Sequence, residues 1–238
     1  MPGRSEWAPL PELPAERDAA ASVSLPDGRT LLIGGWDDGQ ADGEECLTSV
    51  LVLAADGSEW SELPPMAGRR ASAAAALLPD GRVLVAGGRS AAGAESAVKT
   101  VELWDPATQA WSALPDMAEE RNQASACVLP SGRVAVVGGV STDNMDCKNG
   151  EMFDLVRRVW EPLPAEMIHA RNDLDVVAVA GGLLAVGAPL HNSCNELYDE
   201  ESGRWFSLPH PMTEPRVSTN LVLMPAAALL SVAADSDA

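Results

Sequence analysis

Five arginines recur at one position of a repeating pattern, and they are the residues of this sequence best suited to binding a ligand. Each follows a tryptophan by ten or eleven residues; they are Arg17, Arg70, Arg121, Arg171 and Arg216. A guanidinium group donates several hydrogen bonds in one plane, so it can hold a carboxylate or a phosphate through two parallel bonds. Asn122 and Asn172 directly follow two of the arginines and add uncharged donors. We expect these seven residues to form a partner-binding surface.

The same arginines also have a structural interpretation, because a residue that belongs to a repeat can serve the repeat itself. Each guanidinium group could brace a loop by bonding main-chain carbonyls or acidic side chains. Glu16, Glu119 and Glu120 lie close enough along the chain to pair with some of the arginines. The sequence leaves both roles open for each arginine.

Other residues that commonly carry catalysis or bind metals are sparse and scattered. His169, His191 and His210 have no carboxylate neighbours at the spacing of a metal site or a catalytic triad. The four cysteines contain no Cys-x-x-Cys pair. Residues 38–43 faintly resemble the start of a calcium loop, but Ser49 stands where that loop needs a glutamate. We therefore expect no catalytic residue, no metal and no cofactor.

The arginine is one landmark of a pattern that recurs about every 50 residues. Each copy contains a tryptophan, a Leu-Pro pair and the arginine, as in Trp111, Leu114-Pro115 and Arg121. An apolar run follows, then a turn such as Pro79-Asp-Gly-Arg82, and a second apolar run that ends in a glycine pair such as Gly87-Gly88. Glycine turns join antiparallel strands, and short apolar runs are typical of buried strands. Each copy therefore predicts four short strands.

A sheet of four short strands has two apolar faces and cannot cover both of them alone. Radial stacking of such sheets buries each face against a neighbouring sheet. Glycine pairs suit the narrow inner end, where main chains crowd together, and a tryptophan can fill the widening gap further out. The repeat therefore predicts a ring of blades.

The pattern resembles the kelch repeat family. The segment from Val101-Glu-Leu-Trp-Asp105 through Trp111, Met117 and Arg121 follows the kelch pattern closely, with Trp104 in place of the usual tyrosine. The resemblance covers residues 5–235. The copper radical oxidases of this fold need two tyrosine ligands, and this chain has one tyrosine, so the resemblance does not extend to that chemistry. The iron motif of the kelch specifier proteins, Glu-x3-Asp-x3-His, is also absent.

We therefore expect an all-β, kelch-type β-propeller that forms a single domain over residues 1–238. It should contain four complete four-stranded blades, at residues 17–64, 70–115, 121–164 and 171–209. Residues 216–234 and 5–10 should form a fifth blade, closed or half-formed by the two chain ends. The alternative is a fragment of a longer propeller. Residues 235–238 are expected to be a disordered tail.

The charge of the chain limits the classes of partner. With 35 acidic residues, 16 lysines and arginines and a net charge of −19, the surface should repel nucleic acid and anionic membranes. No stretch has the length of a membrane span, and the first residues lack the apolar core of a signal peptide. We expect a monomeric cytoplasmic or nuclear protein.

The resemblance implies a protein-interaction module: a scaffold or substrate receptor that binds an acidic peptide or protein at the arginine-lined mouth of the ring. The variable loops after the glycine pairs, residues 36–48, 89–97, 140–148 and 189–193, should line the same mouth. The alternative is a binding protein for a carboxylated sugar, or a mutarotase-like or epimerase-like enzyme, on the same face. An enzyme would need a general acid or base with a perturbed pKa in these loops. The acids considered for it, Glu44, Glu45, Asp143 and Asp146, give no convincing candidate, so we favour the interaction module.

Overall fold

The computed structural model describes residues 9–37, 45–187 and 194–209, and these residues form β-sheets. Strands β1 to β18 account for the regular structure apart from a single short 3-10 helix, η1 (Ala94–Ser96). Within the described part of the chain, no helix has the length and apolar character needed to cross a bilayer. The all-β prediction is confirmed.

Four antiparallel sheets of four strands each follow one another along the chain, and we call them blades 1 to 4. Blade 1 contains β1 (Ala21–Ser24), β2 (Thr30–Ile33), β5 (Val50–Leu53) and β6 (Trp60–Leu63). Blade 2 contains β7 (Ala74–Leu77), β8 (Val83–Ala86), β9 (Val101–Asp105) and β10 (Ala110–Leu114). Blade 3 contains β11 (Ser125–Val128), β12 (Val134–Val137), β13 (Gly150–Asp154) and β14 (Val159–Pro162). Blade 4 contains β15 (Asp175–Val179), β16 (Gly182–Val186), β17 (Glu196–Asp199) and β18 (Arg204–Ser207). A small ribbon of β3 (Trp36–Asp37) and β4 (Glu45–Cys46) extends the first long loop.

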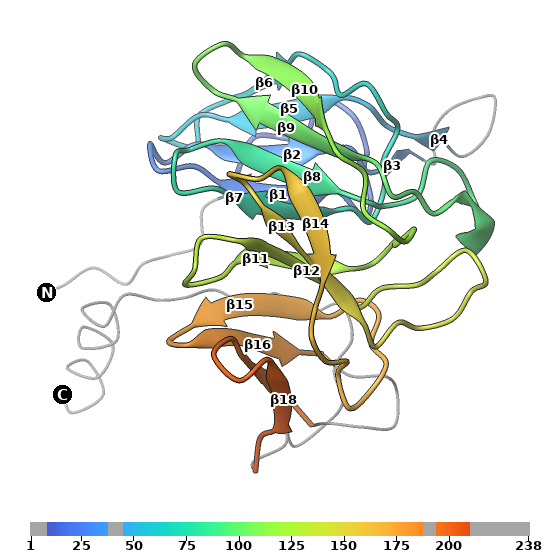
Figure 1. The fold of residues 1–238 in the computed structure, drawn as a ribbon. Coiled ribbons are helices and arrows are strands. Elements are labelled where there is room, and N and C mark those ends of the chain that lie inside the picture. The colour runs from blue at the N-terminus through green and yellow to red at the C-terminus, as the bar shows by residue number, and fades with distance from the viewer. Residues whose placement is uncertain (1–8, 38–44, 188–193, 210–238) are drawn as a thin grey trace, which may run out of the picture.

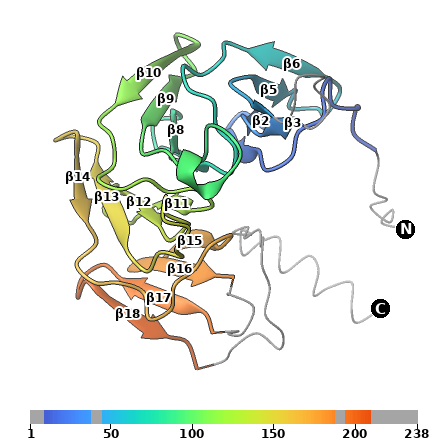
Figure 2. The ribbon, with the colours of Figure 1, turned by 90° about the vertical axis from the view of Figure 1, so that its right-hand side faces the viewer.

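The four blades are arranged around an arc, with the first strand of each on the inside and the fourth on the outside (Figures 1 and 2). The inner strands β1, β7, β11 and β15 are neighbours in that order. The predicted propeller is therefore confirmed for its four complete blades. The predicted fifth blade lies outside the described residues and stays a prediction.

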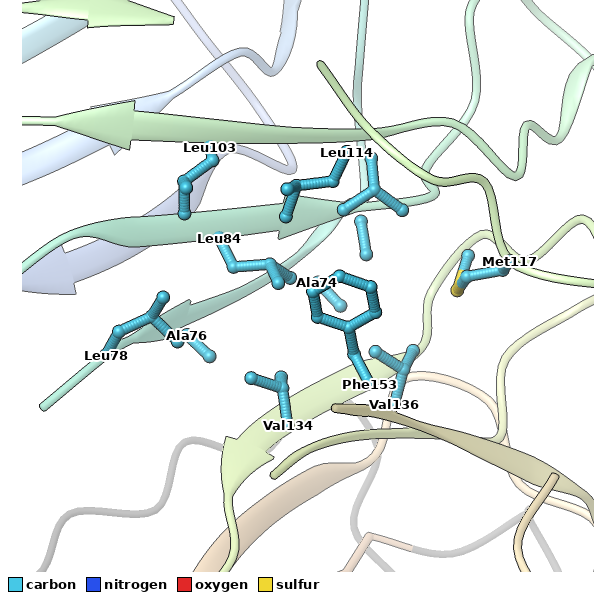
Figure 3. Close-up of a cluster of buried hydrophobic side chains, with 12 residues drawn as sticks. Ala74, Ala76, Leu78, Leu84, Leu103, Leu114, Met117, Val134, Val136 and Phe153 are labelled. Carbon is cyan, nitrogen blue, oxygen red and sulfur yellow. The ribbon is translucent and has the colours of Figure 1, made fainter. Parts of the chain in front are cut away.

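The hydrophobic core lies between the blades and not within any one of them. Figure 3 shows Leu84 and Leu103 of blade 2 facing Val134 and Phe153 of blade 3, all at most 4% exposed. Similar clusters join blade 1 to blade 2 and blade 3 to blade 4. Each blade therefore depends on its neighbour to bury its apolar faces.

The glycine pairs mark the places where one blade meets the main chain of the next. Gly87 has a φ of +66°, and a Cβ built on it would lie 2.3 Å from the carbonyl oxygen of Arg121, the residue that leads into blade 3. Gly88 donates its N–H to the same carbonyl at 2.8 Å. Gly34 makes the equivalent close approach to Arg70. The second glycine of each pair donates its N–H to the arginine that leads into the next blade. The first glycine has no side chain that would clash with that arginine's carbonyl oxygen.

The tryptophans of the repeat join neighbouring blades at the outer side. The indole Nε1 of Trp111 donates to the Pro64 carbonyl, and that of Trp160 donates to the Pro115 carbonyl, both at 2.8 Å. Trp60 bonds the Pro11 carbonyl in the same way at 3.1 Å. Each acceptor lies in the Leu-Pro landmark of the preceding repeat, so two landmarks that are distant along the chain form one contact.

The glycine contact makes a prediction about stability. Gly87→Ala should destabilise the protein by about 2 kcal/mol more than Gly81→Ala, because both residues have positive φ but only Gly87 faces a main-chain carbonyl. Nothing lies within 4 Å of a Cβ built on Gly81, so that variant measures the conformational cost alone. Urea unfolding of both variants checks this. Equal losses would show that the close approach does not matter.

Candidate functional site

The inner ends of the four described blades are joined by a row of three main-chain hydrogen bonds at one mouth of the channel. Two residues after each of the four repeat arginines that the structure describes, the chain adopts positive φ: +49° at Ala19, +52° at Ser72, +56° at Gln123 and +46° at Asp173. Ser72 donates its N–H to the Ala19 carbonyl at 2.8 Å, Gln123 to Ser72 at 2.9 Å, and Asp173 to Gln123 at 3.1 Å. We call these four residues the collar. They hold the first strands of four blades in fixed positions around the mouth.

Three of the predicted arginines, Arg70, Arg121 and Arg171, lie behind the collar, inside their own blades. Arg70 and Arg121 are 1% exposed and Arg171 is fully buried. The Arg70 Nη1 donates to the carbonyl oxygens of Gly87 and Thr100, both at 2.8 Å. Arg121 and Arg171 make equivalent bonds to the first glycine and to the segment before the third strand.

A buried glutamate on the third strand completes each of these three clusters. The Glu102 carboxylate is 3.0 Å from the Arg70 guanidinium and accepts main-chain N–H bonds from Ala67 and Gly68 at 2.8 and 3.1 Å. Glu151 pairs in the same way with Arg121, and Glu196 pairs with Arg171. Burial lowers the pKa of Arg70, and the Glu102 carboxylate opposes that shift.

These pairs bear directly on the predicted partner-binding set. A guanidinium group that is buried, hydrogen-bonded and paired with a carboxylate adds little positive potential at the mouth. The geometry therefore favours the bracing role for Arg70, Arg121 and Arg171. The partner-binding role of these arginines stays a prediction, and it would require these clusters to open.

The three glutamates are functional parts of the fold that our sequence reasoning missed, although a signal was present. Each opens a Glu, apolar, aromatic, Asp string: Glu102–Asp105, Glu151–Asp154 and Glu196–Asp199. Blade 1 lacks it, because Leu51 stands at the glutamate position and is buried. Arg17 is half-buried and bonds the Gly34 carbonyl at 2.9 Å. No described residue accepts a hydrogen bond from its buried Nε.

The other predicted site residues take separate positions. Asn122 is buried and its Nδ2 lies 3.4 Å from the Val140 carbonyl, whereas the Asn172 Nδ2 donates to Asp146 at 2.6 Å. Both bonds connect a collar segment to the loop of blade 3. His169 contacts Glu196 through its Nδ1 at 3.1 Å. Arg216, His191 and His210 lie outside the described residues.

Among the described residues, no three histidine, cysteine or carboxylate side chains come together as a metal site. The Cys127 thiol is not available as a nucleophile, because burial raises its pKa to about 12. Burial also raises the pKa of Cys147, which lies in the loop of blade 3.

A cavity of about 490 Å³ opens at the collar and draws on all four blades. Its polar side chains are Asp18, Ser72, Arg89, Gln123 and Asp173. A second cavity of about 430 Å³ lies along the first strands and is lined mainly by alanine and serine. The two share Ala20, Ala73, Ala124 and Leu174, each of which directly precedes an inner strand. The mouth therefore leads into a channel with mostly small side chains.

Arg89 is the cation of this cavity, and it differs from the repeat arginines. Its guanidinium carbon lies 4.5 Å from the centre of the Trp36 ring, which is a cation–π contact between blades 1 and 2. No described residue accepts a hydrogen bond from its buried Nε. In the sequence, residue 89 stands out only as the start of a variable loop.

Asp173 is the second residue of the cavity that sequence reasoning did not identify. Burial raises the pKa of this half-buried carboxyl. The hydrogen bond from the Gln123 Nε2, at 2.9 Å, and the charge of Arg89 oppose the shift, whereas Asp146 adds to it. The shift is in the direction expected for a carboxyl that acts as a general acid or base. In the sequence, Asp173 is marked only by its place two residues after Arg171.

Comparisons with known proteins identify the repeat. A family described as the Kelch motif matches residues 70–118. The F-box/kelch-repeat protein At1g80440 of Arabidopsis thaliana is 30% identical over 189 residues, which cover 76% of this chain and 51% of that protein. Kelch-like protein 40 of Xenopus laevis is 26% identical over 213 residues, which cover 84% of this chain and 33% of that protein.

A solved structure described as "Structure of YjhT" superposes with a TM-score of 0.76 at 15% identity. The match covers 90% of this chain and 76% of that chain, and it supports the fold alone. Our chain spans about half the length of the first relative and a third of the second. The kelch-type prediction is confirmed.

The buried arginine cluster can be tested with a double-mutant cycle. Arg70→Leu and Glu102→Gln should each cost about 3–5 kcal/mol, because each leaves a buried group without its partner. The double variant should cost much less than the sum of the two. Chemical denaturation measures all three.

The matched control is the exposed Arg82–Asp80 pair, for which Arg82→Leu and Asp80→Asn should each change stability by about 0–1 kcal/mol. If Arg70→Leu cost as little as Arg82→Leu, the guanidinium of Arg70 would be free, and its predicted partner-binding role would gain support.

Proposed function

We propose, from the premise that this chain belongs to the kelch-repeat family, that its propeller is a protein-interaction module that binds its partner at the collar face. Kelch-repeat relatives generally mediate interactions between proteins, which supports this class of function. Because the chain spans only part of those relatives, its partner has to be inferred from its own surface.

The observation that carries this proposal is the convergence of four blades on one polar cavity. The main-chain bonds of the collar fix the positions of its members, while their side chains differ from blade to blade: Ala19, Ser72, Gln123 and Asp173. A rigid scaffold with variable side chains at one end is a common arrangement for recognition. The loop of blade 3 adds Met145, which is 66% exposed and lies on the same face.

The charges of the collar face differ from those of an arginine ring. The charged side chains that line its cavity are Asp18, Arg89 and Asp173. Arg70, Arg121 and Arg171 are paired with buried glutamates. Within the collar cavity, an acidic partner would therefore meet the cation of Arg89 beside the carboxylates of Asp18 and Asp173. We propose that the partner contacts Arg89, Gln123 and Met145 and that the repeat arginines support the surface from behind.

A second candidate function is a small-molecule site on the same face, and Asp173 is the observation that favours it. The cavity volume of about 490 Å³ lies within the range of small-ligand sites. Asp173 has the raised pKa that a general base for a mutarotase-like or epimerase-like reaction would need. Polarimetry of a hexuronate tests this: a mutarotation rate that is the same with the parent, with Asp173→Asn and without protein would exclude the enzyme.

The interaction module makes a prediction about two exposed apolar residues of blade 3. Met145 lies in the loop after β12, on the collar face, and Val156 lies in the hairpin between β13 and β14, on the opposite face. Met145→Asp should weaken binding of a selected peptide or protein partner by about tenfold or more, because it places a charge in the contact surface. Val156→Asp, at a residue that is 93% exposed, should leave binding unchanged.

The partner for this experiment comes from a peptide display selection against the intact chain, with affinities measured by calorimetry. Both substitutions should leave stability within about 0.5 kcal/mol, because both side chains are exposed. The same affinity for the parent and Met145→Asp, or a loss with Val156→Asp alone, would place the interaction on another surface.

A further inference from the structure

Arg89 is a cation of the collar face that has no assigned role in the fold, and its surroundings suggest one. We infer that the Arg89 guanidinium binds a single carboxylate of the partner inside the collar cavity. This inference rests on the proposed function, since it names the chemistry by which the same face would recognise its partner.

Arg89 lies outside the architecture of the repeat. The position directly after the glycine pair is Trp36 in blade 1, Arg89 in blade 2 and Val140 in blade 3. A bracing role shared by all blades therefore does not explain this arginine. By contrast, Arg70, Arg121 and Arg171 occupy one repeat position and make the same set of internal bonds.

The hydrogen-bonding capacity of Arg89 is not used by the described part of the chain. Its main-chain N–H bonds the Ala71 carbonyl at 2.9 Å, its guanidinium stacks on the Trp36 ring, and its charge acts on Asp173. No described residue forms a hydrogen bond with its side chain. Its Nε is buried and unpaired, whereas the two terminal Nη groups are not among the buried atoms and are the donors that a ligand in the cavity can reach. A carboxylate is the natural complement, because its two oxygens match the parallel N–H groups of a guanidinium edge.

The stack on Trp36 prepares the guanidinium for this role. A ring against one face of the group leaves the in-plane N–H donors available, and it restricts the side chain before a ligand arrives. Trp36 is 7% exposed and packs with Cys46 and Ala71, so the ring itself is firmly held. The cation therefore sits on a rigid support and loses little freedom on binding.

The cavity also limits what the ligand can be. A volume of about 490 Å³ admits one side chain or one small acid, and does not admit a folded element. Asp18 and Asp173 line the same cavity, so a second carboxylate beside the first would meet like charges. The cavity should therefore select a single carboxylate with neutral neighbours over a run of acidic residues.

The experiment follows the Arg89 Nε–H signal by NMR during titration of the intact chain with four probes. The probes are the capped peptide Gly-Glu-Gly, its Gly-Gln-Gly analogue, the capped peptide Glu-Glu-Glu, and glucuronate. We expect Gly-Glu-Gly to shift the signal and to bind at least about tenfold more tightly than either the glutamine analogue or Glu-Glu-Glu. Glucuronate distinguishes a sugar acid from a peptide as the source of the carboxylate.

Two variants complete the test. Arg89→Gln should weaken Gly-Glu-Gly binding by about tenfold or more, whereas Arg82→Gln, which removes an exposed arginine from a hairpin on the opposite face, should not change it. Equal affinity for Gly-Glu-Gly and Gly-Gln-Gly, or an unchanged affinity in Arg89→Gln, would overturn the inference. If Arg89→Gln left binding unchanged but Met145→Asp still weakened the selected partner, the proposed function would stand and the Arg89 inference would fall. If neither substitution weakened binding, both proposals would be rejected.

Discussion

The fold depends on one buried interaction that is repeated from blade to blade. An arginine enters the blade, donates to the carbonyl of the first glycine and pairs with a glutamate on the third strand, as Arg70 does with Gly87 and Glu102. The same glutamate holds the loop that leads to the arginine through two main-chain N–H groups. The main-chain carbonyl of the arginine meanwhile accepts the N–H of Gly35 in the preceding blade. Arg70 thus connects its own loop to the end of β8, to β9 and to the preceding blade. Its buried charge is tolerated because these elements supply hydrogen-bond and ion-pair partners.

This arrangement separates the residues that maintain the ring from those that a partner can reach. Because Arg70, Arg121 and Arg171 are occupied by the scaffold, the chemistry of the collar cavity comes from residues outside the repeat pattern, such as Arg89, or from side chains that vary within it, such as Asp173. Blade 1 departs from the rule. It has the buried Leu51 in place of the glutamate. Pro14, which has no main-chain N–H, stands at one of the two positions that donate to that glutamate in the other blades. Blade 1 therefore lacks both the carboxylate acceptor and one of its donors.

The blades could be predicted from the sequence because their landmarks recur in phase. Trp111, Pro115 and Gly87-Gly88 have the same spacing in several copies, and the contacts they make explain why. The role of Arg70 could not be decided from the sequence, because spacing does not say whether a side chain enters the blade or faces the channel. Glu102 was missed because its repetition was read only as part of a strand. Arg89 and Asp173 were missed for a different reason: their partners, Trp36 and Gln123, lie about 50 residues away in neighbouring blades.

The collar has a further consequence for how such a surface can change over time. The three bonds that join its residues from blade to blade run between main-chain atoms, so the side chains of Ala19, Ser72, Gln123 and Asp173 can be exchanged while those bonds remain. The exchange of Gln123 or Asp173 would remove only the added side-chain bond between them. The positive φ of these positions restricts the exchange, since β-branched residues are strained there and small or polar ones are accepted more readily. The collar positions can therefore be substituted independently, but only by a restricted set of residue types. Evolution or design could therefore change the binding specificity of this face by substituting one collar residue at a time, while the fold of the propeller is kept.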